Sequence, residues 1–474
     1  MHPGAFNRRL QVQRTMTPAT PEPSTRPTKF EVIADDLAHA IVSGQYAPGE
    51  KLPPHRVMAK RLGVTAGTVS RAYANLERRA LAQARVGDGT YVRNLDHGQH
   101  RATQPAAAML IDLAHNVAIA TDEGRALRQT LAELARPGGS AITGLLQYQP
   151  EAGMAHHRAA GARWLHQQFD MPGKAARVMV THGAQHALAA VLRTVARAGD
   201  TILTESLSYS GMVELARSLR LQVIGLEMDR EGLLPHALEH AARTYGSKML
   251  FCTPSLHNPT TATMSLARRK AIATVLERHK MLLMEDVVHA AAMAEPLPAI
   301  ASMLPGQSFL LSSFSKVMAP GLRVGFLEAS ATWLDKVAAS IRADCWMVAP
   351  LMPEIVTRWL DSGLAEQLVA LQRQAIHERL RLAVRCLQGL EFRSAPDLPH
   401  LYLPLPEPWT MPTFTAALRQ GGVQVRTMDH FAAGRGKLPS AVRVSLNAAA
   451  SADQLQAGLQ VLARLLHCAR TVAA

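Results

Sequence analysis

The sequence predicts a multidomain protein in which a small, mostly helical module with a β-hairpin precedes a large α/β domain. Three observations predict this organisation. The chain has 474 residues, which is enough for two or three domains. Residues 30–93 are periodic and basic, whereas from about residue 109 short β-rich runs alternate with amphipathic helical stretches. Such an alternation is typical of a mostly parallel sheet covered by helices.

The pattern divides the chain into four segments. Residues 1–28 contain Pro, Thr and Arg without an apolar stretch, and we expect a disordered basic tail. Residues 29–93 form the small module, and residues 94–108 lack periodicity and are expected to be a linker. Residues 109–474 form the α/β domain, in which the strand candidates are Val178–Thr181, Thr201–Thr204, Leu221–Leu226, Lys248–Cys252, Met281–Met284, Ser308–Ser312 and Arg323–Leu327, and one of the helices between them is Leu266–Arg278.

The charge and the cysteine content indicate the kind of partner and the cell compartment. The formal net charge is +14, and nine basic against two acidic residues lie between Lys51 and Arg93, which favours a polyanionic partner for the module. A solvated basic face is the alternative. The four cysteines are widely spaced, as in a protein of the reducing cytoplasm without disulfides. No apolar run reaches the roughly 18 residues of a membrane span, so no membrane partner is expected.

A helix-turn-helix pattern lies within the basic module. A short helix, Arg56–Leu62, ends at Gly63, and Thr65 can cap a second helix over residues 66–79. A β-hairpin over Ala82–Val92 follows and is predicted to form a wing. Because the second helix of such a unit enters the major groove of DNA, we expect a DNA-facing surface. The residues predicted to face DNA are Arg56, Thr65, Ala66, Thr68, Arg71 and, from the wing, Arg85.

Residues 51–92 resemble the GntR family of bacterial winged-helix repressors. The resemblance is carried by the Leu-Pro before the first of the two helices, the Leu-Gly-Val turn, Thr-Val-x-Arg-Ala in the second helix and Gly-x-Gly-Thr-x-Val in the wing. It implies a winged helix-turn-helix domain that binds a double-stranded DNA operator. A three-helix packing module without DNA binding is the alternative.

A second set of motifs predicts a pyridoxal phosphate site in the α/β domain. This cofactor needs a lysine amine, an anion for its ring nitrogen, a phosphate cradle and a ring sandwich. Lys316, in SSFSKVMAPGLRVG (312–325), is the candidate catalytic lysine, with a salt-bridge lysine as the alternative. Asp286 ends a buried run and can pair with the ring nitrogen. In THGAQHAL (181–188), the amides of Gly183, Ala184 and Gln185 open a helix and can meet a phosphate, although the motif is also an ordinary strand-to-helix turn.

These motifs stand in the chain order of the fold-type I aminotransferases, which residues 109–470 resemble. The resemblance implies the α/β fold of type I pyridoxal-phosphate-dependent transferases, with a large and a small subdomain. It also implies roles for individual residues. Lys316 would form the internal aldimine, Asn258 and His289 would face the cofactor phenolate, and Tyr209 would stack on the ring. The phosphate would be bound by Ser313, Ser315 and Arg323. Tyr148 would reach the cofactor of a neighbouring subunit, and Arg443 would hold an effector carboxylate.

Three positions depart from the family pattern. Leu207 stands where a proline is usual, and Thr261 stands where the NPTG motif has glycine, so a positive φ at residue 261 would strain the backbone. His289 replaces the usual tyrosine, and a histidine that titrates near neutrality would change the cofactor's electronics. His182 and His186 are spaced like a metal pair, but we see no carboxylate nearby in the sequence and predict no metal site.

Joined to the GntR-like module, the domain order resembles the MocR subfamily of GntR regulators, which are usually head-to-tail homodimers. The resemblance implies a pyridoxal-phosphate-dependent transcriptional regulator that senses an amine, an amino acid or a B6 vitamer. An active aminotransferase with an accessory DNA-binding domain is the alternative, and a residual transaminase half-reaction stays open. A repressor whose C-terminal half is only a dimerisation scaffold is a third hypothesis.

Overall fold

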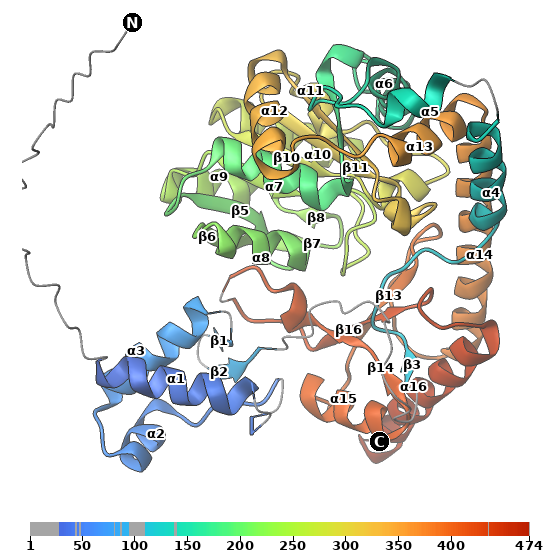
Figure 1. Cartoon of the computed structure of the whole chain (residues 1–474). Coiled ribbons are helices and arrows are strands. Elements are labelled where there is room, and N and C mark those ends of the chain that lie inside the picture. The colour runs from blue at the N-terminus through green and yellow to red at the C-terminus, as the bar shows by residue number, and fades with distance from the viewer. Residues whose placement is uncertain are drawn as a thin grey trace, which may run out of the picture.

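The computed structural model describes residues 28–42, 45–46, 49–79, 81–85, 88–93, 110–136, 140–434 and 436–473 (Figure 1). The predicted tail, residues 1–28, and the predicted linker, residues 94–108, lie almost wholly outside the described residues, so their boundaries stay predictions.

The N-terminal module is a helix-turn-helix followed by a hairpin. It contains α1 (Lys29–Val42), α2 (His55–Leu62), α3 (Ala66–Arg78) and the antiparallel strands β1 (Ala82–Arg85) and β2 (Gly89–Val92). Gly63, at φ 63°, takes the left-handed conformation that ends α2. Thr65 Oγ1 accepts a hydrogen bond from Thr68 N at 3.2 Å and caps α3. Tyr73 and Leu76 lie in the module's core, as their helical spacing predicts.

A seven-stranded sheet forms the centre of the large subdomain. Its strand order is β4 (Val178–Thr181), β12 (Gly325–Ala329), β11 (Ser308–Ser313), β10 (Leu282–Asp286), β9 (Met249–Cys252), β5 (Thr201–Glu205) and β6 (Gln222–Leu226). β12 is antiparallel to both of its neighbours, and the other pairs are parallel. The predicted mostly parallel sheet is therefore confirmed, and all seven predicted runs are strands.

Helices cover both faces of this sheet because its central strands are apolar on both sides. Met249 and Phe251 of β9 pack in the cluster of α7 (Gly183–Val195), α8 (Ser210–Ser218) and α12 (Ala331–Cys345). Leu250 and Cys252 pack on the opposite face with α9 (Pro235–Tyr245), α10 (Leu266–Arg278) and α11 (Ile300–Met303). The other elements here are α4 (Glu123–Leu134), α5 (Ser140–Leu145), α6 (Ala155–Phe169), α13 (Leu351–Asp361), the short strands β7 (Met228–Asp229) and β8 (Gly232–Leu233), and the 3₁₀ turns η1 (Ala175–Arg177), η2 (Ala290–Ala292), η3 (Phe314–Lys316) and η4 (Pro320–Leu322).

The small subdomain is built on a three-stranded antiparallel sheet. The strands lie in the order β13 (His400–Pro404), β16 (Ala441–Ser445) and β15 (Arg426–Thr427), with α15 (Met411–Gln420) and α16 (Ala452–Ala473) packed in the same core. β3 (Ile111–Asp112) pairs with β14 (Val423–Gln424), so the first described residues after the linker segment belong to this subdomain. The turn η5 (Met428–Phe431) follows β15.

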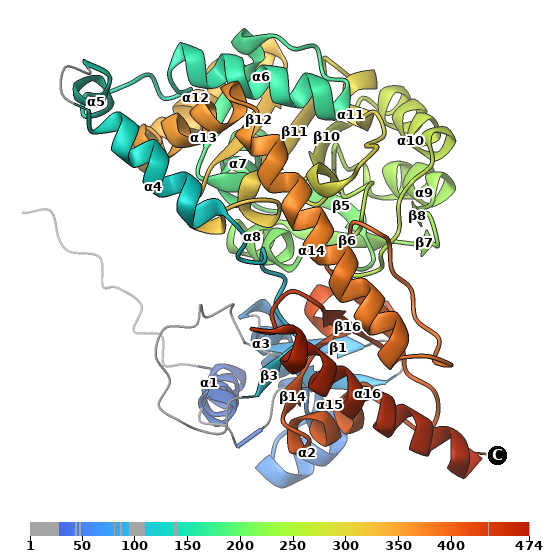
Figure 2. The ribbon, with the colours of Figure 1, turned by 90° about the vertical axis from the view of Figure 1, so that its right-hand side faces the viewer.

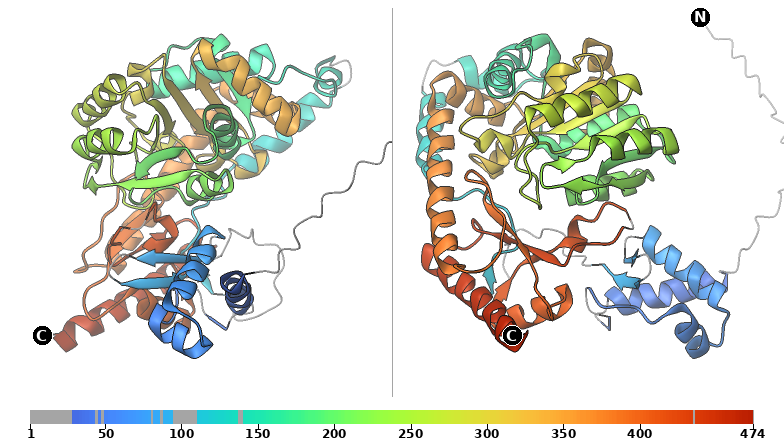
Figure 3. Two further views of the ribbon diagram at one scale, coloured as in Figure 1. Left: turned by 90° about the vertical axis from the view of Figure 1, so that its left-hand side faces the viewer. Right: turned by 180° about the vertical axis from the view of Figure 1, so that it is seen from behind.

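The long helix α14 (Leu364–Cys386) runs along one side of the molecule and joins the two subdomains, as Figures 1 and 2 show. The N-terminal module lies beside the small subdomain on the side away from α14, a placement visible from the back in Figure 3. Among the described residues, every helix is too short or too polar to cross a bilayer.

Candidate functional site

The predicted cofactor residues follow the carboxyl ends of neighbouring strands. Asp286 is the last residue of β10, and β11 leads directly into the turn that contains Lys316. β4 ends next to Gly183, and Tyr209 lies four residues after β5. Because neighbouring parallel strands end at the same edge of a sheet, these side chains converge there, at the place where open α/β sheets bind ligands.

An anion cradle lies at the N-terminus of α7. Arg323 Nη1 donates to Ser315 Oγ at 3.1 Å, and the Ser313 and Ser315 hydroxyls are 2.9 Å apart. Gly183 has φ 77°, and a Cβ on it would lie 3.0 Å from Arg323 Nη2. The amides of Ala184 and Gln185 follow in the first turn of the helix. The positive end of the α7 dipole, the Arg323 guanidinium and the two serine hydroxyls together fit a phosphate. A side chain at residue 183 would fill the space between these groups.

Lys316 and Asp286 act on each other's charge inside the site. Burial lowers the pKa of Lys316 to about 8, and the nearby charges of Arg443 and Arg323 act in the same direction. Burial raises the pKa of Asp286 to about 6, although a hydrogen bond from Val288 N at 2.9 Å stabilises its anion. The lysine therefore presents a reactive neutral amine in a larger fraction than a solvent-exposed lysine does, while the carboxylate stays mostly ionised at pH 7.

His289 is held neutral in this site. Burial, followed by the charges of Lys316 and Arg443, lowers the pKa of His289 to about 3. The expected titration near neutrality is therefore wrong, because the surrounding cations and the lack of solvent disfavour the imidazolium. A neutral imidazole still offers one N–H donor, as the tyrosine hydroxyl of the family does.

Asn258 and Arg443 are joined by a hydrogen bond. Arg443 Nη1 donates to Asn258 Oδ1 at 2.9 Å, so the asparagine has its Nδ2 left as a donor, the atom that a phenolate needs. Arg443 is 5% exposed, and burial lowers its pKa to about 9. Its Nε is buried and has no hydrogen-bond partner among the described residues. An oxyanion could therefore bind here without first displacing a carboxylate from that atom.

Two further predictions concern Tyr209 and Thr261. Burial raises the pKa of Tyr209 to about 12, and the charge of Asp286 acts in the same direction. Thr261 has φ 67°, which is the left-handed conformation that the family's glycine tolerates. Thr261, which stands where the family motif has glycine, is therefore strained in this loop.

Backbone carbonyls of the first residues after the linker segment complete the site, and sequence reasoning missed them. Lys316 Nζ donates to Asn116 O at 2.6 Å, and Arg443 Nη2 donates to Ala114 O. Asn116 Nδ2 lies 2.9 Å from His400 Nδ1. A carbonyl exists at every residue, so no side-chain motif could have pointed to these positions.

Two groups of predicted residues lie elsewhere. Tyr148 is 82% exposed and packs edge-on against Trp346, with ring centroids 6.0 Å apart, so within one chain it does not join the cradle. His186 Nε2 lies 3.5 Å from Asp344 Oδ2, a carboxylate that is distant in the sequence. Asp344 also pairs with Arg193 at 2.7 Å, which makes this an ion-pair cluster on α7 and α12.

The predicted DNA-facing residues lie at the start of α2 and along α3. Arg56, Ala66 and Arg71 are exposed, and the Arg71 guanidinium stacks over the Phe30 ring at 4.2 Å. Thr65 and Thr68 share the hydrogen bond that caps α3. The Arg85 side chain lies outside the described residues, although its backbone is part of β1.

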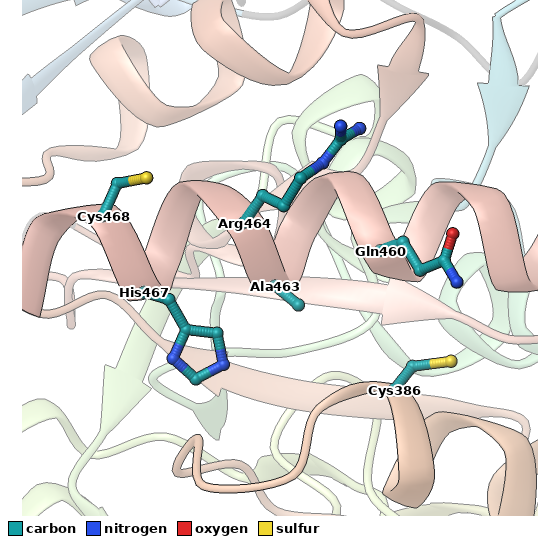
Figure 4. Close-up of a pocket in the computed structure, with 6 residues that line it drawn as sticks. All are labelled: Cys386, Gln460, Ala463, Arg464, His467 and Cys468. Atoms are coloured by element: carbon teal, nitrogen blue, oxygen red, sulfur yellow. The ribbon is translucent and has the colours of Figure 1, made fainter.

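A separate hollow lies on the outer side of the small subdomain, between α14 and α16 (Figure 4). Its lining residues are Cys386, Gln460, Ala463, Arg464, His467 and Cys468. None of the six belongs to the sheet edge around Lys316, and the two cysteines lie well apart in this view.

Together, a type I transferase fold, a lysine–carboxylate pair beside an anion cradle, and a winged helix-turn-helix define a class of protein: transcriptional regulators with an aminotransferase-like domain. Residues 108–462 match the family of aminotransferase class I and II, and residues 29–92 match the bacterial regulatory proteins of the gntR family. The chain belongs to the aminotransferase class I and II family, with a GntR-type module at its N-terminus.

Relatives share both parts of this architecture. The uncharacterized HTH-type transcriptional regulator YdeF of Bacillus subtilis is 27% identical over 445 residues, which cover 92% of this chain and 94% of the relative. The pyridoxine biosynthesis regulator PdxR of Corynebacterium glutamicum is 26% identical over 88% of this chain and 90% of its own length. The vitamin B6 salvage repressor PtsJ of Salmonella typhimurium is 25% identical over 84% and 90%. The resemblance to the MocR-type regulators is thereby confirmed.

Solved structures confirm the fold of the large domain. A multiple substrate aminotransferase from Thermococcus profundus superposes with a TM-score of 0.70 at 20% identity, over 77% of this chain and 93% of the other. The α-aminoadipate aminotransferase LysN from Thermus thermophilus does so with a TM-score of 0.69 at 22% identity, over 77% and 94%.

Proposed function

We propose that this regulator binds pyridoxal phosphate at Lys316, and that its affinity for operator DNA changes when an effector binds at the same site. One observation carries the proposal. Lys316, Asp286 and the Gly183–Arg323 cradle converge at one sheet edge, in a chain whose N-terminal module presents a capped recognition helix.

The residues of the site fit the cofactor. When bound, pyridoxal phosphate supplies an aldehyde for amines and an electron-accepting ring. Lys316 offers the amine that captures the aldehyde, and Asp286 offers the anion that stabilises a protonated ring nitrogen. Arg323, Ser313 and Ser315 are placed to hold the phosphate.

The effector belongs to one of three classes: B6 vitamers, amines or amino acids. The names of PdxR and PtsJ connect two relatives with vitamin B6, which favours the cofactor or a vitamer as effector. The Arg443 Nε without a partner favours an effector that carries a carboxylate, since a guanidinium binds this group in a planar, two-point geometry. Either kind of ligand would compete with the chain's own donors and acceptors at Lys316 and Arg443.

We also propose that two chains associate through the surface around Tyr148. Tyr148, Trp346 and Leu146 are 82%, 59% and 79% exposed, which is unusual for large apolar side chains in one neighbourhood of a folded chain. The expected head-to-tail homodimer would cover them and bring Tyr148 to the other chain's phosphate cradle. Such a dimer would present two recognition helices to paired operator half-sites in the cytoplasm.

An active aminotransferase is the second candidate function. The lowered pKa of Lys316, the carboxylate of Asp286 and the guanidinium of Arg443 supply what a transaminase half-reaction needs. Regulation is favoured because Thr261 and His289 depart from the family pattern and a DNA-binding module precedes the domain. Formation of keto acid from amino acids at ordinary enzyme rates would reverse this preference.

The experiment combines absorbance with DNA binding. Purified protein is titrated with pyridoxal phosphate while the visible absorbance of the lysine-bound cofactor is recorded, and operator affinity is measured with and without vitamers and amino acids. We expect visible absorbance in the wild type, its loss in Lys316→Ala, and an operator affinity that changes only in the wild type. A colourless wild type that cannot be reconstituted would instead favour the scaffold hypothesis.

A further inference from the structure

The DNA-binding module contacts the aminotransferase-like domain, which we call the effector domain. The contact lies at the base of the module's wing. Gln83 Nε2 of β1 donates to Gly434 O at 3.2 Å. Arg93, the last described residue before the linker segment, is only 7% exposed. Burial lowers the pKa of Arg93, and the carboxylates of Glu214 and Asp429 act in the opposite direction. A guanidinium loses much hydration on burial, so its place here depends on those two carboxylates.

Asp429 and Gly434 bound one short stretch of the effector domain, residues 429–434, which we call the docking segment. Its other side is bonded to the residues just before Tyr209. Phe431 O accepts from Ser208 N at 2.8 Å, and Ala433 N donates to Ser206 O at 3.0 Å. The backbone packing is close, since a Cβ on Gly225 would lie 1.8 Å from Ala433 O. The docking segment therefore cannot move without moving the chain that precedes Tyr209.

The docking segment also contacts Arg443, the arginine that we propose binds the effector. The Arg443 guanidinium lies 5.0 Å from the centroid of the Phe431 ring. Arg426 is the cross-strand neighbour of Arg443, and its Nη2 lies 2.8 Å from His115 Nε2. His430 lies near all these cations. Burial lowers the pKa of His430 to about 3, and the charges of Arg426, Arg443 and Arg93 act in the same direction. Charges at the effector site and at the docked module thus act on one imidazole.

We infer that the docking segment, together with Glu214, is a binding surface for the chain's own DNA-binding module, and that the charge bound at Arg443 controls how firmly the module is held. This inference rests on the proposed function. An anionic group at Arg443 offsets the positive potential that Arg443, Arg426 and Arg93 exert together on His430 of the docking segment, so it strengthens the docking of Arg93 there. It also competes with Ala114 O, which lies on the chain leading back to the linker.

Docking has a direct consequence for operator binding. A module fixed by Gln83 and Arg93 holds its recognition helix in one orientation relative to the effector domain, whereas a released module does not. In a dimer, only modules at a fixed spacing and angle meet two half-sites together. Since binding couplings are reciprocal, operator DNA must change effector affinity by the same factor as the effector changes operator affinity.

The test uses the full-length chain and the variant Arg93→Gln, which removes the buried charge. Arg79→Gln is the matched control, because Arg79 is a cation of the same module whose partner is Asp35, within the module. Gln83→Ala is a second variant in case the loss of a buried arginine impairs folding. The first readout is hydrogen exchange of the docking segment, without DNA, in cofactor-loaded protein, before and after adding the standard amino acids one at a time.

We expect at least a tenfold faster exchange of the docking segment in Arg93→Gln than in the wild type or Arg79→Gln, and slower exchange in the wild type when a ligand binds. The second readout is the ratio of operator affinities with and without that ligand. A wild-type ratio of about tenfold, within the usual range for allosteric coupling, should fall below about twofold in Arg93→Gln while the absorbance titration at Lys316 stays unchanged.

The outcomes separate the two levels of proposal. If a ligand changes the operator affinity of the wild type and changes that of Arg93→Gln by the same factor, the docking inference is wrong and the proposed function stands. If no amino acid, amine or B6 vitamer alters wild-type operator affinity, the sensing function fails. If exchange of the docking segment is the same in wild type and Arg93→Gln, or does not respond to any bound ligand, the docking surface itself is refuted.

Discussion

The altered protonation of Lys316 gives a prediction that can be worked through in numbers. Burial, and then the charges of Arg443 and Arg323, lower the pKa of Lys316 to about 8. At pH 7.5 a lysine with this pKa is neutral in about 24% of molecules, against about 0.1% for an ordinary lysine with a pKa near 10.5. Because only the neutral amine attacks an aldehyde, Lys316 should capture the cofactor some 200-fold faster than an unperturbed lysine in the same position.

The assay is the rate of visible absorbance gain after mixing apo-protein with pyridoxal phosphate between pH 6 and 10. The rate should rise with pH, pass its midpoint near pH 8 and level off above it, since protonated Lys316 is unreactive. The same series with Nα-acetyl-lysine amide in solution corrects for titration of the cofactor itself, and there the midpoint should lie near the ordinary lysine value.

A substitution tests the cause of the shift as well as its size. Arg443→Met removes a cation that opposes the charged form of Lys316, so the midpoint should move to higher pH. Burial contributes most, so the midpoint should not return fully to 10.5. A wild-type midpoint at or above pH 10, or a midpoint in Arg443→Met that moves to lower pH, would refute the assignment of a desolvated, cation-flanked lysine.

Three further predictions follow from named contacts. Gly183→Ala should weaken cofactor affinity at least about tenfold by absorbance titration, because the new Cβ enters the cradle at φ 77°, whereas Gly199→Ala, at φ 96° with no neighbour within 4 Å, should not. Thr65→Ala should lose the cap of α3 and about 1 kcal/mol of stability in the DNA-binding module, measured by thermal unfolding. Glu354→Gln should cost about 2–3 kcal/mol at pH 7 in denaturant unfolding, since Glu354 accepts from His157 at 3.1 Å and its pKa is held well below 4.5. That contribution exists above the unfolded pKa and is lost as pH falls, so variant and wild type should converge at acid pH.

The strands and the main cofactor residues could be predicted because their physical causes leave a pattern in the sequence. Central parallel strands are buried on both faces, so β9 and β11 appear as continuous apolar runs bounded by polar residues. Ligand-binding residues follow such runs directly, as Asp286 follows the apolar part of β10. The order of motifs along the chain then indicated one sheet edge, and the structure brings those residues together there.

His289 shows how a property expected from the sequence changes in the folded protein. From the sequence alone its imidazole has an ordinary pKa near 6.5, which suggests a switch at neutral pH. The structure surrounds it with Lys316, Arg443 and buried walls, which keep it neutral. Such a shift depends on atoms that come from distant parts of the chain, so no local pattern reveals it. Thr261 is the opposite case, because its positive φ follows from the family turn, and the backbone does adopt it.

The contacts that could transmit a signal were the least predictable of all. Ala114 and Asn116 act through carbonyl oxygens, and the docking segment acts through its backbone and through Phe431, which would ordinarily be taken for a core residue. What makes them informative is their position: the first two lead back to the linker, and the docking segment touches both Arg443 and the module's Gln83. A regulator needs such shared contacts, since a ligand can shift an equilibrium only by interacting differently with its two states. Arg93→Gln, which leaves every group at Lys316 in place, therefore separates regulation from cofactor binding more cleanly than any substitution within the site.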